Sequence, residues 1–278
     1  MDSLELCRKY KEREYMDRVS HIVRLEYLEG IHGESIVISL TEELSGLLER
    51  VSDGLSRVKR NSCRNVTLLD AIGSASIEGS SASIDSISEF MEGGSLSRND
   101  LMVFNIIKAV NIYRGKQEYS IGSIVEMWKT VSDGVCENMQ KQGSLFRSEM
   151  VYIGSDLEII HTPELPKNIT SRMVSLVKFL NSDSIVSILK GIVCHYYIEY
   201  IHPMCDCNGR LGRLLQNVII GGNIDRIAVN SVINENLSGY YKAIKNSNVS
   251  CNVCGLGMCI DVAPFVEYIL RCMMMAIG

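Results

Sequence analysis

The sequence predicts a mostly α-helical fold, and three observations support that prediction. Apolar residues recur at intervals of three and four positions along most of the chain, which is the spacing of one helix face. Only 4 of the 278 residues are proline, so few helices need be interrupted. The alternation that is typical of strands is clear only near residues 151–161. We therefore expect strands in one short hairpin and at most one short piece elsewhere.

The apolar stripes give the order of the expected helices. Ser97 and Asp100 precede the first stripe, and Asp261 is expected to cap the last helix. The stripes fall at Val103, Ile106, Ile107 and Val110; at Ile121, Ile124, Val125, Trp128 and Val131; at Met173, Leu176, Val177 and Leu180; at Ile185, Ile188, Leu189 and Ile192; at Ile233, Leu237, Tyr240 or Tyr241, and Ile244; and at Phe265, Val266, Ile269, Leu270 and Met273.

The composition fits one compact unit with two regions. With 46% hydrophobic residues, the chain has enough apolar area for one or two domains. Glycine-rich seams lie at residues 30–33 and 93–95. We expect the first seam to set off an N-terminal helix. The second separates an N-terminal helical region, residues 1–93, from a core at residues 94–278.

Charge and hydropathy argue against two classes of partner. The net charge of −5 disfavours nucleic-acid binding, because phosphate contacts need clustered lysines and arginines. No apolar stretch reaches the length that spans a membrane, so we expect no membrane contact. Residues 1–5 lack the basic and then apolar pattern of a signal peptide, which favours a cytoplasmic location.

One segment carries most of the chemical information: residues 202–213, with the sequence HPMCDCNGRLGR. An apolar helix spacing follows and predicts a helix that begins at about Asn208. Free backbone N–H groups and the positive end of the helix dipole favour an anion there, typically phosphate. The apolar positions of this helix are Leu211, Leu214, Leu215, Val218 and Ile219.

The polar side chains of this segment suit phosphoryl or nucleotidyl transfer. Arg210 and Arg213 are three positions apart, so they share a helix face and can bind one polyphosphate. Asp206 can hold Mg²⁺ against that phosphate, and His202 can act as a base near neutral pH. The alternative is an ordinary helix N-terminus with two solvated arginines. A histidine and a carboxylate in register make that alternative the weaker one.

This segment resembles the signature of the Fic family, His-Pro-Phe-x-(Asp/Glu)-Gly-Asn-Gly-Arg-x-x-Arg. Two positions depart from it: Met204 replaces a phenylalanine, and Cys207 replaces a glycine. A flexible methionine can fill the slot of an aromatic ring, whereas the Cβ of Cys207 is expected to crowd the phosphate or restrict the backbone. The matching positions are His202, Pro203, Asp206, Asn208, Gly209, Arg210 and Arg213.

The resemblance implies a Fic-type helical bundle with a short β-hairpin flap, acting as a protein adenylyltransferase. By this resemblance, His202 deprotonates a Tyr, Thr or Ser hydroxyl of a target protein, which attacks the α-phosphate of ATP. Asp206 is the implied ligand of Mg²⁺, and Arg213 takes the γ-phosphate. The other implied nucleotide-binding residues are Asn208, Gly209, Arg210, Ile153, Gly154, Tyr240 and Asn248.

A second segment, residues 74–79 with the sequence SASIEG, resembles the inhibitory-helix motif of the same family, (Ser/Thr)-x-x-x-Glu-(Gly/Asn). The resemblance implies that Glu78, with Ser74 in the same regulatory motif, pairs with Arg213. A carboxylate there removes the γ-phosphate clamp and adds negative charge where the triphosphate must lie. The alternatives for Glu78 are a solvated helix residue or a local cap.

A third segment resembles the flap of the family. Phe146 and Arg147 lead into residues 151–163, which come before a helix near residues 168–181. The alternation of Val151 and Ile153, followed by turn-forming residues, predicts a two-stranded ribbon. In the family the flap aligns the target segment by strand addition. An ordinary surface hairpin explains these residues equally well.

Three functions stay open. The expected one is transfer of AMP from ATP to a hydroxyl of a protein docked on the flap, with autoinhibition by Glu78. Removal of AMP from a modified protein would use the same residues, with Glu78 positioning a water. The third is a non-catalytic binding or toxin-like Fic module in which Cys207 weakens the phosphate site. The oligomeric state is open, with a homodimer as one alternative.

The ten cysteines are expected to be reduced thiols, since no export signal is apparent. Cys251 and Cys254, with Cys259 nearby, have half of a zinc-site spacing, but no second pair follows, so loop cysteines without zinc are favoured. Cys207 at a helix N-terminus would have a lowered thiol pKa and would be a redox handle. A tolerated small residue is the preferred alternative.

Overall fold

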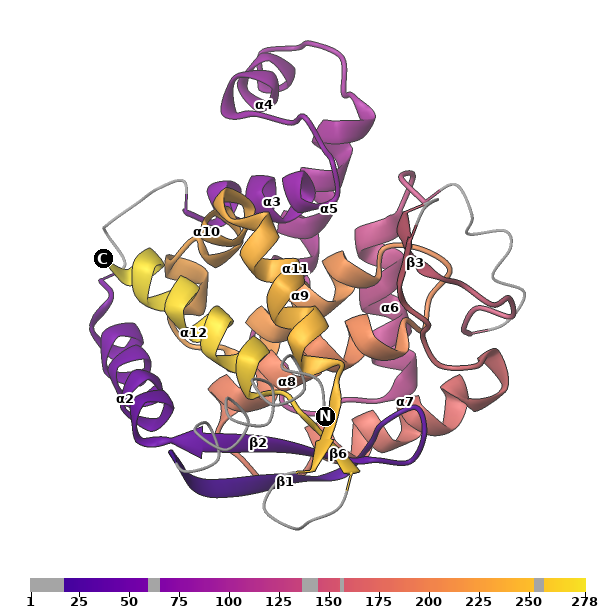
Figure 1. Cartoon of the computed structure of the whole chain (residues 1–278). Helices are drawn as coiled ribbons and strands as arrows, with labels where there is room; N and C mark the ends of the chain where they lie inside the picture. Colours follow the sequence, from indigo (N-terminus) through magenta and orange to yellow (C-terminus); the bar gives the residue numbers. More distant parts are fainter. Residues whose placement is uncertain (1–17, 60–65, 137–144, 156–157, 253–257) are drawn as a thin grey trace.

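The structure is a computed structural model that describes residues 18–59, 66–136, 145–155, 158–252 and 258–278 (Figure 1). The helices are α2 (Glu42–Arg57), α3 (Val66–Ile77), α4 (Ile84–Met91), α5 (Arg98–Tyr113), α6 (Ile121–Ser132), α7 (Pro166–Leu180), α8 (Ser187–Ile201), α9 (Asn208–Ile220), the short η2 (Ile224–Arg226), α10 (Val229–Glu235), α11 (Leu237–Ser247) and α12 (Ala263–Ile277). The strands are β1 (Val19–Glu29), β2 (Ser35–Thr41), β3 (Ile153–Ser155), β4 (Glu158–His161), β5 (Ser250–Asn252) and β6 (Met258–Asp261).

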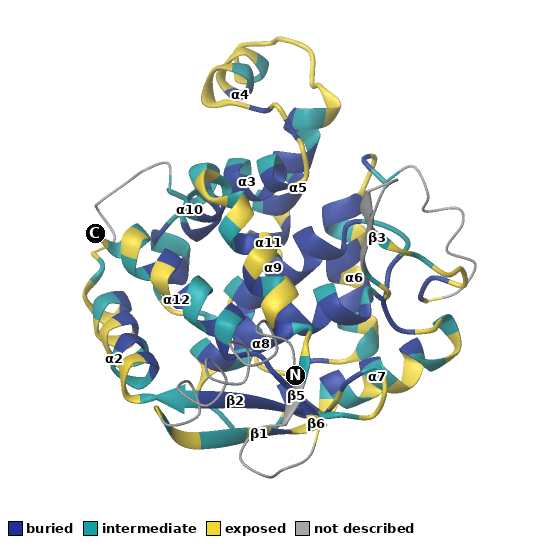
Figure 2. Ribbon diagram, viewed as in Figure 1, coloured by how far each residue is buried: buried dark blue, intermediate teal, exposed yellow. Residues whose placement is uncertain are grey.

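The fold is mostly α-helical, as predicted, and α8 and α9 lie at its centre (Figure 2). Helix α8 is buried on nearly every face, and a helix of that kind is stable only inside a core. Helix α9 packs closely along it at Gly212, where a Cβ would lie 2.8 Å from Cδ2 of His195. Helices α5, α6, α7 and α12 cover this pair.

A four-stranded sheet, in the order β1-β2-β6-β5, lies along one side of the molecule. One expectation is therefore wrong: strands are not confined to the flap and one short piece. Residues 19–29, before the first seam, form β1, and the rest of the segment in which an N-terminal helix was expected, residues 1–17, lies outside the described residues. Irregular register interrupts the alternation of β1, so its buried Leu25 and Leu28 are three apart, which is a helix-like spacing. In β2, Ile36 pairs with Ile260 of β6, far along the chain. Local periodicity does not reveal such pairing.

The helix cap expected at Ser97 is confirmed, whereas Asp261 lies one residue before the N-cap of α12. Ser97 forms a reciprocal capping box with Asp100 at the start of α5. At the start of α12, the carboxylate of Asp261 accepts a hydrogen bond from the backbone N–H of Ala263 at 3.0 Å. The same oxygen accepts from the N–H of Ser39 at 3.1 Å, so Asp261 also joins the last helix to β2.

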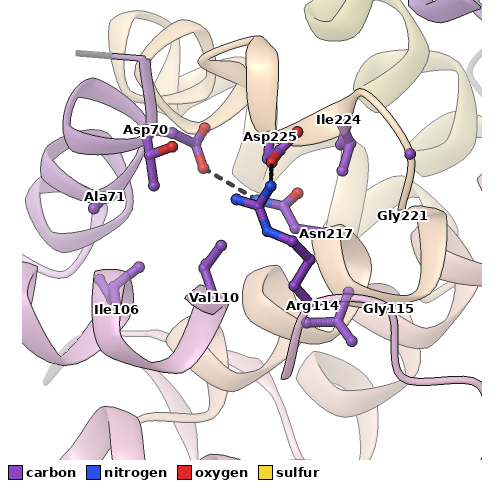
Figure 3. A pocket seen from close by; sticks show the side chains of 13 residues that line it. Asp70, Ala71, Ile106, Val110, Arg114, Gly115, Asn217, Gly221, Ile224 and Asp225 are labelled. Carbon is purple, nitrogen blue, oxygen red and sulfur yellow. Dashed lines mark hydrogen bonds and ion pairs between the residues drawn. The ribbon is translucent and has the colours of Figure 1, made fainter. Parts of the chain in front are cut away.

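Helix α3 is fixed on α9 and α10. The buried carboxylate of Asp70 accepts hydrogen bonds from the backbone and side chain of Asn230, at 2.7 and 2.8 Å, and from Asn217 at 3.1 Å. Gly73 lies directly against α10, because a Cβ there would be 2.4 Å from the backbone nitrogen of Ser231. Figure 3 shows Asp70 and Asn217 on the wall of a small pocket between α3, α5 and α9. The helix with the second motif is therefore held rigidly.

Helix α4 projects from the body of the molecule and is followed by the predicted seam at residues 93–95 (Figure 1). The division into regions 1–93 and 94–278 stays a prediction. Among the described residues, no helix is both long and apolar enough to cross a membrane.

Candidate active site

The candidate site is built on the sharp reversal between α8 and α9. Two non-glycine residues of this loop have left-handed backbones: His202, with φ 49° and ψ 63°, and Cys207, with φ 66° and ψ 21°. This backbone conformation costs a non-glycine residue about 1–3 kcal/mol of folding free energy. It persists only where the surrounding structure imposes it, often at a functional site. The loop backbone itself therefore marks a candidate site.

Side chains of the loop and of α6 hold this reversal in shape. The amide of Asn208 accepts from the backbone N–H of Met204 at 2.9 Å and donates to the carbonyl of Met204 at 3.0 Å. The indole N–H of Trp128 donates to the carbonyl of Asp206 at 2.8 Å. The loop is therefore tied both to itself and to the helical core.

Arg147 braces the loop from the side of the flap. Its buried guanidinium donates from Nε to the carbonyl of His202 at 2.6 Å and from Nη1 to the carbonyl of Glu149 at 2.7 Å. Its backbone N–H donates to the carbonyl of Pro203 at 3.0 Å. Because a guanidinium is planar and rigid, these bonds set the orientation of the His202 backbone.

The side chain of His202 is neutral at physiological pH. Burial, with the positive charge of Arg147, lowers the pKa of this imidazole to about 4, although the carbonyl of Glu199 and the carboxylate of Glu78 act in the opposite direction. Nδ1 is buried and makes no hydrogen bond of ordinary geometry with any described residue. A neutral imidazole is the form that accepts a proton from a substrate.

The guanidinium of Arg213 is buried and bound by residues of the second motif. Its Nε donates to the hydroxyl of Ser74 at 2.9 Å, and its Nη2 donates to the carbonyl of Ser74 at 3.1 Å and to Oε1 of Glu78 at 2.7 Å. Burial acts to raise the pKa of Glu78, but the charge and hydrogen bond of Arg213 hold it below its ordinary value. The expected pairing of Glu78 with Arg213 is therefore present.

Gly209, in the first turn of α9, is where these groups meet. A Cβ at this position would lie 2.3 Å from Oε1 of Glu78, 2.9 Å from Oε1 of Glu199 and 3.0 Å from Nη1 of Arg213. No side chain fits there while Glu78 is in place. The helix N-terminus, which was expected to attract phosphate, thus faces a carboxylate of the protein itself.

Glu199 is a site residue that the sequence analysis missed. Burial and the nearby carboxylate of Glu78 raise its pKa to about 7, against the charge of Arg213 and a hydrogen bond of 3.2 Å from the hydroxyl of Tyr240. A carboxyl group that titrates near neutral pH beside an arginine is a candidate functional group. The sequence did contain a signal for Glu199: it lies three residues before His202, and residues with that spacing share a helix face.

Comparisons with known proteins agree with this geometry. Residues 123–220 match the Fic/DOC family. The chain carries a domain of the Fic/DOC family. It is 30% identical over 162 residues to protein adenylyltransferase Fic of Drosophila ananassae, covering 56% of this chain and 28% of that protein. It is 25% identical over 233 residues to protein adenylyltransferase fic-1 of Caenorhabditis briggsae, covering 78% and 41%. The chain therefore spans less than half the length of either relative.

Solved Fic structures share the fold. A Fic family protein from Desulfovibrio desulfuricans G20 has a TM-score of 0.69 at 20% identity, over 86% of this chain and 74% of that one. Fic-1 from Caenorhabditis elegans has a TM-score of 0.61 at 20% identity, over 84% and 71%. These likenesses confirm the predicted helical bundle with its hairpin flap.

The Fic domain does not bring every predicted site residue together. His202, Asp206 and Arg210 lie on the loop and the first turn of α9, and Arg213 follows one turn later. The other predicted nucleotide-binding residues lie on other elements, and not all of them lie beside these motif side chains.

Tyr240 lies beside Arg213, but it is buried and also bonded to Nε2 of His195 at 3.0 Å. The side chain of Asn248 accepts a hydrogen bond from the hydroxyl of Tyr196 at 2.8 Å. Tyr240 thus lies between Arg213 and the buried His195, whereas the side chain of Asn248 is bonded to Tyr196 of α8 rather than to the motif.

The flap of the Fic domain is the hairpin of β3 and β4, in which Ile153 pairs with His161. The ring of His161 donates from Nε2 to the carbonyl of Tyr200 at 2.7 Å, so β4 is anchored at the end of α8. Ile153 and Gly154 therefore lie on a hairpin that is fixed next to the His202 loop. The tip, residues 156–157, lies outside the described residues.

The lowered thiol pKa expected for Cys207 is not found. Burial raises the pKa of this thiol, although Arg210 acts in the opposite direction. Its Sγ accepts a hydrogen bond from Nη2 of Arg210 at 2.7 Å, so the thiol engages a guanidinium expected to bind phosphate.

Met204 is fully buried, as expected for a residue that replaces an aromatic ring in the core. Cys254, half of the predicted cysteine pair, lies outside the described residues.

Asp206 fits the magnesium ion that the Fic resemblance implies. Its half-buried carboxylate accepts from the backbone N–H of Cys207 at 2.6 Å through Oδ1, which fixes it at the start of α9. The other oxygen is a hard donor of the kind that Mg²⁺ prefers.

Proposed function

We propose that this chain transfers AMP from ATP to a hydroxyl group of a protein, and that Glu78 restrains the reaction. The observation that carries the proposal is the ion pair of 2.7 Å between Glu78 and Arg213 beside the His202 loop. An internal anion there occupies the position expected for a phosphate. The name protein adenylyltransferase, which both relatives bear, supports the reaction type.

His202 acts as the general base in this proposal. Its neutral imidazole takes the proton of the target hydroxyl while the hydroxyl oxygen bonds to the α-phosphorus of ATP. The bond between that phosphorus and the bridging oxygen breaks, and pyrophosphate leaves with the electron pair. AMP remains on the target oxygen, and the left-handed turn held by Arg147 keeps the imidazole in place.

The start of α9 binds the triphosphate. Its backbone N–H groups and the guanidinium of Arg210 contact phosphate oxygens, and Arg213 takes the γ-phosphate once Glu78 leaves. Asp206 holds Mg²⁺, which neutralises part of the phosphate charge when bound. Asn208 contributes by shaping the loop, because its amide is bonded to Met204.

The target protein docks on the flap. In the described part of the chain, β3 and β4 pair only with each other, so each has an open edge that can accept a strand. The bond from His161 to the end of α8 holds this hairpin near His202. A residue aligned on the flap therefore presents its hydroxyl to the base.

Removal of AMP from a modified protein is a second candidate, and the seated position of Glu78 favours it. The carboxylate of Glu78 is close enough to His202 to influence its pKa, so the two can orient a water between them. Water would then attack the phosphorus, the bond to the target oxygen would break, and AMP would leave while the target regains its proton.

Differently labelled ATP separates these functions. The Glu78→Gly protein is incubated with ATP labelled at the α- or the γ-phosphorus, and label retained on protein is measured. Retention of α-label alone supports AMP transfer, whereas retention of γ-label would show phosphorylation. No retention of either label, with ATP binding intact, would support a non-catalytic module. Release of AMP from the labelled protein by wild type would support AMP removal.

Replacement of Cys207 by glycine is expected to tighten ATP binding about fivefold, the effect of one hydrogen bond of about 1 kcal/mol. The change frees Nη2 of Arg210 for phosphate and removes a Cβ from a left-handed position. Calorimetric titration of the Glu78→Gly protein, with and without Cys207→Gly, measures it. Cys207→Ser, which keeps the Cβ, is the matched control. Weaker binding in the glycine variant would contradict this role.

ATP affinity of the wild type is expected to fall as the pH rises through about 7, the pKa of Glu199. The protonated carboxyl is neutral, whereas the ionised form adds a negative charge next to Arg213 and opposes the triphosphate. The expected loss is roughly fivefold, for an interaction of about 1 kcal/mol in a partly solvated site. Glu199→Gln should lose this dependence and keep only the titration of ATP itself. Parallel pH profiles for the two proteins would refute the assignment.

A further inference from the structure

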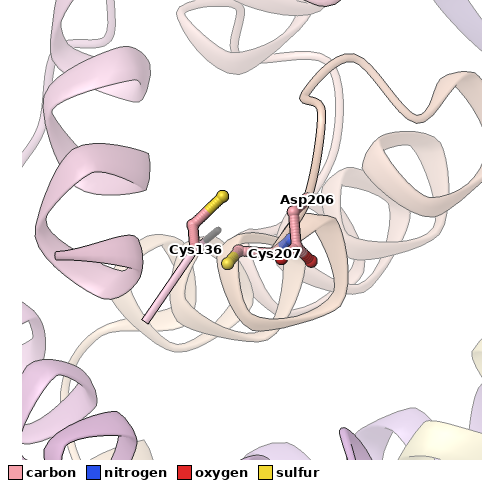
Figure 4. Close-up of side chains that lie close together, drawn as sticks. All are labelled: Cys136, Asp206 and Cys207. Carbon is pink, nitrogen blue, oxygen red and sulfur yellow. The ribbon is translucent and has the colours of Figure 1, made fainter. Parts of the chain in front are cut away.

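A cluster of thiols around one carboxylate lies at the edge of the site. Cys136, from the segment after α6, meets Asp206 and Cys207 of the motif loop (Figure 4). One ligand atom from each of the three lies within 4.8 Å of the other two. A further thiol is close, because Sγ of Cys205 is 4.0 Å from Sγ of Cys136. Segments far apart in the sequence therefore place three metal-binding groups together, with a further thiol beside one of them.

The distances suit a tetrahedral metal. Zinc binds sulfur at about 2.3 Å and carboxylate oxygen at about 2.0–2.2 Å, which puts neighbouring ligand atoms of a tetrahedron about 3.5–3.8 Å apart. The three ligand atoms lie within 4.8 Å of one another, so they need to approach by roughly 1 Å, and rotation of the half-buried Cys136 side chain can bring its sulfur toward the other two. Thiolates select zinc over magnesium, which prefers oxygen ligands only.

The surrounding charge also suits a bound dication. Two thiolates and one carboxylate carry three negative charges, which Zn²⁺ and the neighbouring Arg210 would balance. The guanidinium of Arg210 already donates to Sγ of Cys207 at 2.7 Å and can keep that bond when the sulfur binds metal. Asp206 and Cys136 are only half-buried, so an ion can reach the cluster from solvent.

We propose that Cys136, Asp206 and Cys207 form a three-ligand binding site for Zn²⁺, with the fourth position open to water, and that zinc there blocks the nucleotide site. The inhibitory part rests on the proposed function, because it depends on Asp206 holding Mg²⁺ and Arg210 holding phosphate. Zinc would take the carboxylate that Mg²⁺ needs and would retain Arg210 beside a thiolate. It would therefore inhibit AMP transfer even in excess Mg²⁺.

Metal binding is tested with Co²⁺ as a spectroscopic probe and Zn²⁺ as its competitor. The reduced full chain carries Cys251→Ser and Cys254→Ser, so that the other thiol pair does not contribute. We expect one Co²⁺ per chain with a thiolate-to-cobalt charge-transfer band that Zn²⁺ displaces. Cys136→Ser and Cys207→Ser should each weaken binding by more than the roughly 10- to 100-fold that loss of an outer-shell partner costs.

Cys272→Ser, at a buried cysteine of α12, is the matched control and should bind like the parent. Circular dichroism checks that each variant is folded. Absence of a charge-transfer band in the folded parent, or a band of unchanged affinity in both Cys136→Ser and Cys207→Ser, overturns the site.

Inhibition is measured separately, on AMP transfer by the Glu78→Gly protein in excess Mg²⁺. Zinc should inhibit at the concentrations at which it displaces Co²⁺, and Cys136→Ser should be resistant while keeping its zinc-free activity. Equal inhibition of both proteins would overturn the regulatory role. Cobalt binding without any AMP transfer would instead count against the proposed function and leave the metal site standing.

Discussion

The Glu78→Gly protein is expected to transfer AMP on the order of a hundredfold faster than wild type. Glu78 pairs with Arg213 at 2.7 Å, and its carboxylate fills the space in front of Gly209. The side chain of Glu78 is 32% exposed, so separating the pair costs about 3 kcal/mol, the lower end of the range for buried pairs, and each 1.4 kcal/mol is about tenfold. ATP must overcome this cost in wild type and not in the variant. Initial rates of α-label incorporation into protein measure the difference.

Two controls show whether the released arginine causes the gain. Arg213→Ala in the Glu78→Gly background should cancel it, because the γ-phosphate clamp is then gone. Glu78→Gly alone should unfold at a lower temperature without nucleotide and regain stability with ATP and Mg²⁺, since a bound ligand stabilises the folded state. If wild type removes AMP from a modified protein, and Glu78→Gly loses that activity without transferring AMP faster, AMP removal would be the function.

His202→Ala is expected to lower AMP transfer by about a hundred- to ten-thousand-fold, the usual contribution of a general base. ATP affinity should be retained, because the phosphate-binding groups of α9 are untouched. The comparison is made in the Glu78→Gly background, with His32→Ala, at an exposed histidine, as the matched control. Retained activity in His202→Ala would rule out the base, and a parallel loss of ATP binding would indicate collapse of the loop.

The pH profile gives a further check on His202. A base must be deprotonated, so activity is lost as the pH falls through the pKa of the free enzyme. With that pKa lowered to about 4, kcat/KM should not decline near 6.5, the ordinary value for histidine. If kcat/KM declines near pH 6.5 while kcat, measured at saturating ATP, does not, the free enzyme holds the histidine in a wetter environment than the structure shows.

Short segments with a fixed spacing were predictable from the sequence. Residues 202–213 combine a helix start with side chains of defined chemistry, so both the first residue of α9 and the cluster around it could be predicted. The sheet could not, because its strands pair across the whole chain and Leu25 and Leu28 have the spacing of a helix. Strand pairing is a tertiary property that one local window does not contain.

The details of the site depended on burial and distance. The pKa of the Cys207 thiol is set by burial rather than by the helix N-terminus. Glu199 matters because Glu78 and Arg213 come close to it from other elements. The Fic resemblance implied that Asn248 binds the nucleotide, whereas in the fold its side chain is hydrogen-bonded to Tyr196.

The two residues that bind Arg213 differ in how firmly the fold holds them. Ser74 lies inside α3, which Asp70 and Gly73 fix to its neighbours, whereas Glu78 follows the last residue of that helix. When Glu78 leaves, the guanidinium keeps its bonds to the hydroxyl and carbonyl of Ser74. In the proposed mechanism, activation is then an exchange of one anion for another on a preoriented cation, and we expect that no helix has to undock. If Glu78 inhibits AMP transfer as proposed, the segment that inhibits the reaction also preorganises the arginine for phosphate.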